Sequence, residues 1–266
     1  MKPSRYLAAA RALLEAHEKR ARYEPLPPDL APANEEEAYL IQDDFVALRA
    51  QSAGGIVGYK IALSTQAMRD FVGVKEPQAG AMLQRHLRRS PATVRAADYV
   101  RLIVEFEIAV ELADDLPAAD APFGRERVAA AIGAVMPAIE IADDRNADYG
   151  ALSRQPLDLI ADNCWNEGAV LGEPVRGWQG LDLGAVRGVA RINGKEAGRG
   201  AGAEALGHPL DAVAWVARNL AYRGRGMLRG DVVITGSLVT SKMPVAGDHI
   251  EWSVGGGLGT VSLRVE

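Results

Sequence analysis

The stretch that decides the fold is RLIVEFEIAVEL, residues Arg101–Leu112. Side chains of an extended strand alternate between two faces, so every second residue lies on the same face. One face of this strand is wholly apolar and consists of Leu102, Val104, Phe106, Ile108, Val110 and Leu112. The other face carries Glu105, Glu107, Ala109 and Glu111. The pattern predicts a strand whose apolar face is buried in a core and whose opposite face is acidic.

Glu105 and Glu107 stand two residues apart and therefore point the same way. Such carboxylates repel each other unless a cation lies between them or water screens them. A hard divalent cation such as Mg²⁺ or Mn²⁺ is a natural partner for these oxygens. The alternative is a half-exposed edge strand with a solvated acidic face, and the strand taken alone favours that alternative.

Composition indicates an ordinary globular enzyme rather than a nucleic-acid-binding protein. The chain has 266 residues, 48% of them hydrophobic and 24% charged, with a net charge of −5. No long Lys/Arg block is present, so we expect no nucleic-acid partner. Cys164 is the single cysteine, and no apolar run suits a signal peptide or a membrane span. We therefore expect a cytoplasmic protein that does not associate with membranes.

The order of elements predicts a helical N-terminal annex, residues 1–55, followed by a strand-rich domain, residues 56–266. An amphipathic helix is expected over residues 3–22, and Asn34 with Glu37 forms a capping-box pattern that begins a second helix. Further helices are expected at 65–71, 125–135 and 209–223. Strands are expected at 56–63, within 91–112 (ending in the acidic strand), at 136–142, within 169–193, and at 232–238, 249–254 and 260–265. This mixed order favours an α+β fold with a predominantly antiparallel sheet.

Two further residues stand out in apolar strands. Glu140 lies in the run PAIEI, where a glutamate is seldom buried without a partner. If its strand lies beside the acidic strand, Glu105, Glu107 and Glu140 form a three-carboxylate site for a hard cation. Lys60 lies between two small or apolar neighbours in GYKIAL. It either reaches solvent or lies near the metal with a lowered pKa, where it could carry protons.

Other catalytic patterns are missing from the sequence. There is no Walker motif and no GxSxG nucleophile elbow. The four histidines, His17, His86, His208 and His249, do not pair at metal-ligand spacing. We expect each of them at the surface or in the core rather than in catalysis.

Several segments together resemble the 2-keto-4-pentenoate hydratase / 4-oxalocrotonate decarboxylase family of the fumarylacetoacetate hydrolase superfamily. In chain order they are GYKIAL from Gly58, GVKEPQAG from Gly73, EFEIA from Glu105, PAIEI from Pro137, IADN from Ile160, GRGAGAEALGHP from Gly198 and GDVVITGSL from Gly230. The resemblance implies a mixed β-roll of the fumarylacetoacetate hydrolase C-terminal type with a helical N-terminal region. It also implies Mg²⁺ or Mn²⁺ held by Glu105, Glu107 and Glu140, and Lys60 in proton transfer.

The resemblance further implies a lyase of aromatic catabolism that acts on a small 2-oxo acid. Members are usually homo-oligomeric, and association with a sister enzyme of the pathway is a further expectation. The hydratase is the first expectation and the decarboxylase the alternative. An acylpyruvate C–C hydrolase and a non-catalytic partner subunit are less favoured, because no histidine matches the hydrolase pattern and the Glu and Lys set is intact. Weaker candidates for substrate binding are Gln78, Asn163, Thr235 and Ser237.

Two positions depart from the family pattern. Hydratases of the family typically carry an aspartate where this chain has Gln78. An amide does not titrate in the useful range and cannot act as a general base. The change therefore speaks against hydration and for a decarboxylase, which needs no activated water. The second departure is Trp165-Asn166, where relatives often have small serines. The bulky Trp165 either reshapes the pocket or fills the core.

Overall fold

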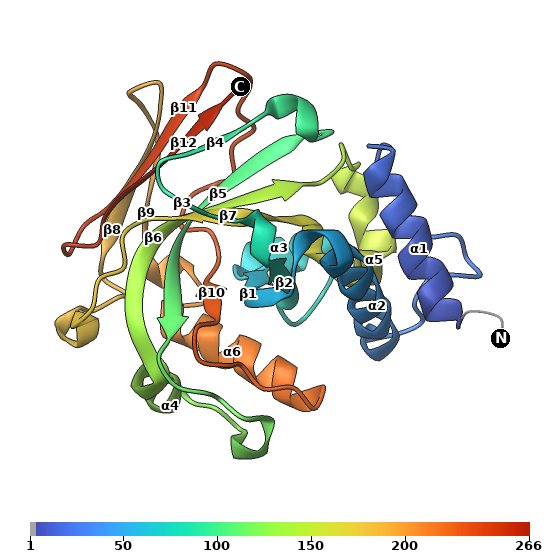
Figure 1. Ribbon diagram of the computed structural model, residues 1–266, viewed down its shortest axis with the longest axis horizontal. Helices are drawn as coiled ribbons and strands as arrows, with labels where there is room; N and C mark the ends of the chain where they lie inside the picture. Colours follow the sequence, from blue (N-terminus) through green and yellow to red (C-terminus); the bar gives the residue numbers. More distant parts are fainter. Residues whose placement is uncertain (1–3) are drawn as a thin grey trace.

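The computed structural model describes residues 4–266 and shows two β-sheets with helices around them (Figure 1). The α-helices are α1 (Arg5–Glu18), α2 (Glu35–Ala53), α3 (Gln66–Val72), α4 (Arg125–Ala131), α5 (Pro156–Ala161) and α6 (Pro209–Tyr222). The strands are β1 (Ile56–Ala62), β2 (Gln78–Leu83), β3 (Leu87–Arg89), β4 (Ala92–Val94), β5 (Leu102–Leu112), β6 (Ile132–Asp143), β7 (Asn166–Leu171), β8 (Arg187–Ile192), β9 (Lys195–Ala201), β10 (Val232–Ile234), β11 (His249–Val254) and β12 (Gly259–Val265).

Strands β5 and β6 form the long centre of a seven-stranded sheet with the order β2-β1-β10-β5-β6-β7-β3. A second sheet has the order β4-β12-β11-β8-β9. Pairing is parallel between β1 and β10, β3 and β7, and β4 and β12, and antiparallel in the remaining ladders. The curved β5 and β6 ribbons run from beside α4, past the second sheet, toward the side of α5 (Figure 1). The α+β fold with a predominantly antiparallel core is therefore confirmed.

The main core lies on the apolar face of β5 and includes residues of both sheets and of α6. Phe106 and Trp252 are fully buried there, with ring centroids 5.6 Å apart. The indole Nε1 of Trp252 donates a hydrogen bond to the Glu107 carbonyl oxygen at 2.8 Å. This contact ties the second sheet directly to the acidic strand.

The N-terminal helices α1 and α2 pack against α5, which lies between β6 and β7 in the chain (Figure 1). Asn34 is the N-cap of α2 and accepts a hydrogen bond from the Glu37 amide at 2.9 Å, so the predicted N-cap is confirmed. The Glu37 carboxylate accepts from the Ala33 amide at 2.8 Å rather than from the Asn34 amide of a capping box. Arg5 of α1 forms an exposed ion pair with Glu37. The predicted first helix begins later and ends earlier than 3–22, and its residue 3 lies outside the described residues.

Three sequence predictions need correction. The alternative of an edge strand with a solvated acidic face is wrong, because β5 lies inside the sheet and Glu107 is fully buried. The helix expected over 125–135 ends at Ala131, because Ile132 pairs with Leu112 and extends β6. Ladder hydrogen bonds to β5 thus override local helix propensity. The strand expected over 232–238 ends at Ile234.

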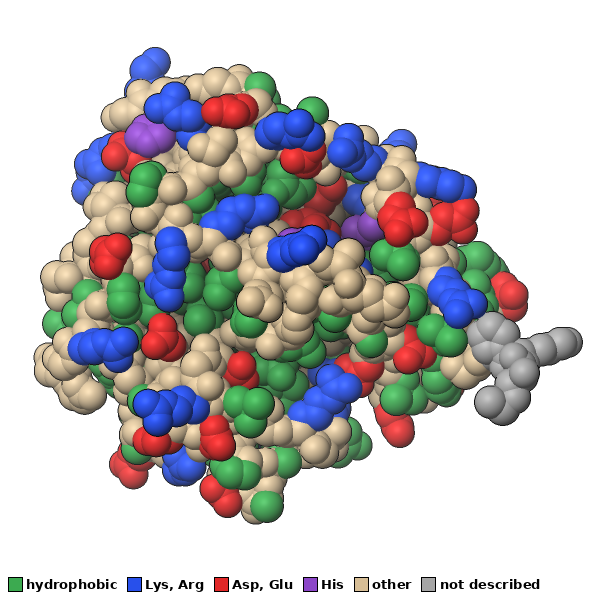
Figure 2. All heavy atoms as spheres, in the orientation of Figure 1, with side chains coloured by type: hydrophobic (Ala, Val, Ile, Leu, Met, Phe, Trp, Pro, Cys, Tyr) green, Lys and Arg blue, Asp and Glu red, His purple; other side chains and the backbone are tan. Residues whose placement is uncertain are grey.

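Within residues 4–266, no helix is long and apolar enough to cross a bilayer. Basic and acidic side chains are interspersed over the face in Figure 2, without a large field of one sign. This distribution agrees with the small net charge and offers no extended basic surface for a nucleic acid on that face.

Candidate metal centre

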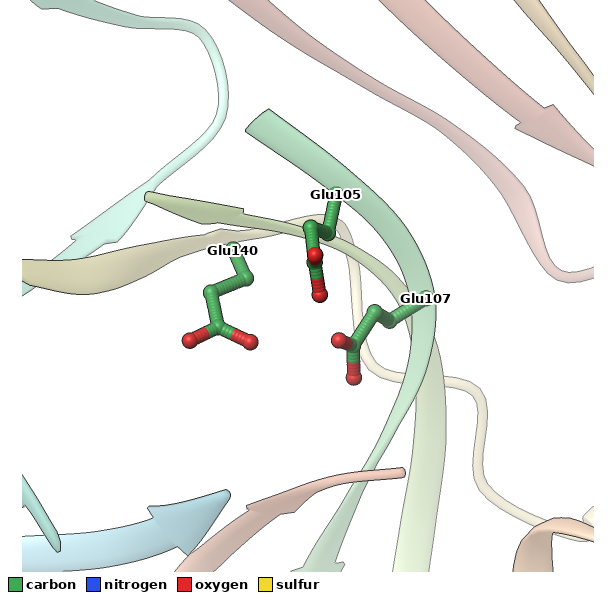
Figure 3. A group of neighbouring side chains, drawn as sticks. All are labelled: Glu105, Glu107 and Glu140. Carbon is green, nitrogen blue, oxygen red and sulfur yellow. The ribbon is translucent and has the colours of Figure 1, made fainter. Parts of the chain in front are cut away.

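Three carboxylates converge on one point of the seven-stranded sheet (Figure 3). Glu105 and Glu107 come from β5, and Glu140 from the neighbouring β6. Glu105 and Glu140 are direct partners across the antiparallel ladder, which places their side chains on the same face. One oxygen from each of the three residues lies within 4.8 Å of those from the other two. The strand register therefore assembles the cluster that the sequence suggested.

One oxygen of each carboxylate accepts a hydrogen bond from another residue of the protein. Glu107 Oε2 accepts a hydrogen bond from the Gly236 amide at 2.6 Å, and Glu105 Oε1 accepts one from Ser241 Oγ at 2.6 Å. Glu140 Oε1 accepts one from Asn166 Nδ2 at 2.9 Å. The second oxygens of the two fully buried residues, Glu107 Oε1 and Glu140 Oε2, have no hydrogen-bond partner among the described residues.

The close packing of these carboxylates raises the pKa values of the two buried ones. Burial, followed by the charges of Glu140 and Glu105, raises the pKa of Glu107 well above its ordinary value. Burial also raises the pKa of Glu140, with Glu105 adding to the effect and Lys60 opposing it. A divalent cation would favour the charged carboxylates and reverse these shifts.

Lys60 lies on β1 and directs its ammonium group at the same cluster. Its Nζ is 3.1 Å from Glu140 Oε1, and its side chain is 95% buried. Gly80 faces it on β2, where an added Cβ would lie 3.2 Å from Lys60 Cγ and 2.8 Å from the Asn163 carbonyl oxygen. Burial alone would lower the pKa of Lys60, but Glu140 and then Glu105 outweigh it and raise this pKa above its ordinary value. The lowered pKa expected from the sequence would therefore require a bound cation.

The residues fit a hard divalent cation. Two orphaned, fully buried carboxylate oxygens carry a desolvation penalty that a ligand would remove. Three oxygen donors with no nitrogen or sulfur donor are the set typical of Mg²⁺ and Mn²⁺ sites that keep positions open for substrate and water. Glu105, Glu107 and Glu140 would hold such an ion, with Lys60 beside it.

Gln78, on β2, is fixed by contacts within the protein. Its Nε2 donates to the Pro156 carbonyl oxygen at 3.2 Å, and its Oε1 lies 4.0 Å from Cys164 Sγ. Burial raises the pKa of the Cys164 thiol to about 12, so this neighbour is a neutral thiol at ordinary pH. Gln78 pairs with Ala62 across the ladder and so shares the sheet face of Lys60, two residues earlier on β1.

The other three weak candidates use their side chains to hold the fold. Asn163 accepts from the Ala81 amide at 2.7 Å and donates to the Ala81 carbonyl oxygen at 2.9 Å. Thr235 Oγ1 donates to the Ile108 carbonyl oxygen at 2.9 Å. Ser237 Oγ accepts from the Phe106 amide and donates to the Val239 carbonyl oxygen. None of these groups hydrogen-bonds a carboxylate of the cluster, and their part in substrate binding stays a prediction.

Sequence reasoning missed the residues that orient the carboxylates. Ser241 gave no signal beyond being polar, and Asn166 stood out only as a departure from the family pattern, with no role assigned to it. Gly236 stands in the quoted GDVVITGSL segment, and it has a φ of +101°. A Cβ at Gly236 would also lie 2.4 Å from Ser64 Oγ, so the amide that binds Glu107 can approach only as a glycine.

Comparisons with known proteins identify the family of the chain. Residues 59–266 match the family model described as fumarylacetoacetate (FAA) hydrolase C-terminal. A 2-keto-4-pentenoate hydratase of Paraburkholderia xenovorans is 31% identical over all of this chain and 97% of the relative. A 4-oxalocrotonate decarboxylase of Pseudomonas putida is 30% identical over 86% of this chain and 84% of the relative.

Solved structures show the same relationship. The 4-oxalocrotonate decarboxylase of Pseudomonas putida G7, complexed with magnesium and adipate, has a TM-score of 0.90 at 27% identity. The match covers 100% of this chain and 99% of that one. The same enzyme complexed with calcium and acetate has a TM-score of 0.89. The chain therefore belongs to the fumarylacetoacetate hydrolase C-terminal family, among its 2-keto-4-pentenoate hydratases and 4-oxalocrotonate decarboxylases.

Proposed function

We propose that this protein is a Mg²⁺- or Mn²⁺-dependent lyase that hydrates a small 2-hydroxy-dienoic acid of the 2-hydroxypenta-2,4-dienoate type. The observation that carries the proposal is the cluster of Glu105, Glu107 and Glu140 with orphaned oxygens on two members and the Lys60 ammonium alongside. Hydratases among the relatives support the substrate class. We further propose that residues 56–266 carry the catalytic site and that the chain acts as a homo-oligomer.

The reaction needs stabilisation of negative charge and movement of protons. The dienol ketonises, water adds to the far end of the conjugated system, and the enolate that results takes a proton back. A bound divalent cation would stabilise the negative charge that develops on the 2-oxo oxygen. The protein supplies the carboxylates that hold the cation and orients each one through a hydrogen bond from Ser241, Gly236 or Asn166.

Lys60 is the proton carrier in this proposal. Its ammonium lies at hydrogen-bond distance from Glu140 Oε1, and its stem lies close to Gly80 of the neighbouring β2. A protonated Nζ can return a proton to the enolate, and the neutral amine can take one from the 2-hydroxyl group of the dienol. Its burial excludes competing water from the proton path.

A 4-oxalocrotonate-type decarboxylase is the second candidate. In that reaction the C–C bond to the far carboxyl breaks, CO₂ leaves, and the electron pair of that bond forms a dienolate of the 2-oxo acid, which then takes up a proton. Gln78 favours it, because its amide is bonded to the Pro156 carbonyl oxygen and cannot activate water. The decarboxylase that matches over the whole chain with a TM-score of 0.90 supports it as well.

The test is an assay with both substrates. Purified protein with Mg²⁺ or Mn²⁺ is mixed with 2-hydroxypenta-2,4-dienoate, and separately with 4-oxalocrotonate, and the loss of ultraviolet absorbance is followed. Turnover of the first substrate supports the hydratase, and turnover of the second supports the decarboxylase. Turnover of neither contradicts both assignments.

A matched pair of variants links turnover to the site. Glu107→Gln removes a buried ligand charge and should abolish turnover and Mn²⁺ binding. Glu111→Gln changes the next glutamate on the same face of β5, which lies 3.7 Å from Arg89 and 3.9 Å from Arg176, and should leave both unchanged. Equal effects of the two substitutions would contradict the site.

A further inference from the structure

The side chain of Glu140, a proposed metal ligand on β6, is oriented by a residue of the neighbouring strand β7. Asn166, the first residue of β7, is 3% exposed and donates its amide hydrogen to Glu140 Oε1 at 2.9 Å. Its own oxygen accepts from the Gly168 amide at 3.1 Å, which fixes the orientation of the amide group. The position of Asn166 therefore sets the direction in which the free oxygen of Glu140 points.

The backbone before Asn166 is strained. Asn163, Cys164 and Trp165 have φ values of +51°, +51° and +58°, all in the left-handed region that side chains other than glycine rarely adopt. Each such residue costs about 1–3 kcal/mol and persists only where its surroundings hold it. Hydrogen bonds from Asn163 to Ala81 hold the first of them.

Two carboxylates, Asp162 buried and Glu167 half-buried, flank this strained turn, and each forms ion pairs with cationic side chains. Asp162, before the turn, pairs with Arg145 at 2.5 Å between Nη2 and Oδ2. Glu167, after it, pairs with Arg49 of α2 at 2.5 Å between Nη2 and Oε2. His17 of α1 reaches both, with Nε2 at 2.6 Å from Asp162 Oδ1 and Nδ1 at 3.4 Å from Glu167 Oε1.

We infer that His17 is a positioning residue for the metal centre, acting through the segment 162–167 to hold Asn166 against Glu140. Nε2 makes a hydrogen bond with Asp162, and Nδ1 lies at ion-pair distance from Glu167 Oε1, which has no hydrogen-bond partner among the described residues. The doubly protonated imidazolium presents an N–H to each of the two carboxylates. His17 thus bridges the two ends of the strained turn as one cation. The annex helix α1 thereby contributes to the geometry of a site to which it supplies no ligand. This inference rests on the proposed metal-dependent function.

The experiment measures Mn²⁺ affinity by calorimetry for the full-length wild type, His17→Gln, Asn166→Ala and the double variant. Gln can donate one hydrogen bond to Asp162 but cannot bridge to Glu167 as a cation. His17→Gln should weaken Mn²⁺ binding about tenfold, as substitutions behind a metal ligand commonly do. Since both residues act in one path, the double variant should bind no more weakly than Asn166→Ala alone.

A control separates this role from simple docking of α1. Arg5→Ala removes the exposed ion pair between α1 and α2 and should leave Mn²⁺ affinity unchanged. The inference would be overturned if the losses of Mn²⁺ affinity caused by the two substitutions added in the double variant. It would also be overturned if His17→Gln bound Mn²⁺ with wild-type affinity. Neither result would contradict the metal site itself. If His17→Gln does not fold, Arg49→Gln tests the same turn from α2, and unchanged affinity there would also overturn it. A wild type that binds no Mn²⁺ would instead contradict the proposed function.

Discussion

Raising the pH should destabilise this protein through His17. The imidazole ring faces Asp162 and Glu167, with the Phe45 ring 5.1 Å away and with Arg145 and Arg49 beyond the two carboxylates. Burial would lower the pKa of His17, but Asp162 and then Glu167 more than offset this and raise the pKa to about 9. The ordinary value is 6.5, so the folded state holds the proton more tightly than the unfolded chain.

The size of the effect follows from proton linkage. A raised pKa in the folded state contributes stability that is complete below pH 6.5 and is lost as the pH rises through about 9. Each tenfold difference in proton affinity is worth about 1.4 kcal/mol, so the full contribution is about 3 kcal/mol. The ring is only 11% exposed, so solvent screening removes little of it.

The assay is urea unfolding followed by tryptophan fluorescence from pH 6 to pH 9.5, with wild type and His17→Gln compared in a chelator. The wild-type free energy of unfolding should fall by about 3 kcal/mol more than that of the variant over this range. Other titrating groups are common to both proteins and cancel in the comparison. Parallel pH profiles for the two proteins would refute the assignment of an imidazolium at His17.

Three further perturbations test the site and the core. Lys60→Met should lower turnover about 10²–10⁴-fold, the usual worth of a proton-transfer group, while Mn²⁺ still binds in calorimetry; loss of binding would contradict the role. Ser241→Ala frees Glu105 Oε1 and should weaken Mn²⁺ binding severalfold, and unchanged affinity would show that this hydrogen bond is dispensable. Gly188→Ala would place a Cβ 2.0 Å from Trp252 Cη2 and should lower the urea midpoint strongly, by about 3 kcal/mol or more, whereas a wild-type midpoint would show that the indole can move.

The strand pattern of the sequence predicted much of the fold. Alternation in Arg101–Leu112 predicted β5 and its buried apolar face, because a period of two is a direct consequence of strand geometry. Asn193-Gly194, a dipeptide typical of hairpin turns, lies between β8 and β9, and these strands pair across it. The end of α4 at Ala131 could not be predicted, because it depends on pairing with a strand twenty residues away.

The residues of the candidate site also fall into two groups, those that the sequence could identify and those that it could not. A charged residue within an apolar strand can be recognised from the sequence, because burying a charge requires a partner. This criterion identified Lys60, Glu107 and Glu140. Ser241 could not be found, because a neutral polar residue is common anywhere in a chain, and the role of Asn166 could not be inferred from its departure from the family pattern. His17 was expected at the surface or in the core, and its carboxylate partners lie about 150 residues away in the chain. Such long-range contacts leave no local pattern.

The direct opposition of Glu105 and Glu140 across the ladder has a consequence for the lifetime of the protein. Two like charges facing each other weaken a strand pair, by about 0.2–1 kcal/mol in exposed sheets. A cation bound between the two carboxylates would replace this repulsion with an attraction that links the two longest strands. At a concentration a hundredfold above its dissociation constant, such an ion adds about 2.7 kcal/mol to stability. Survival of the folded chain in a cell would then depend on metal supply even when no substrate is present.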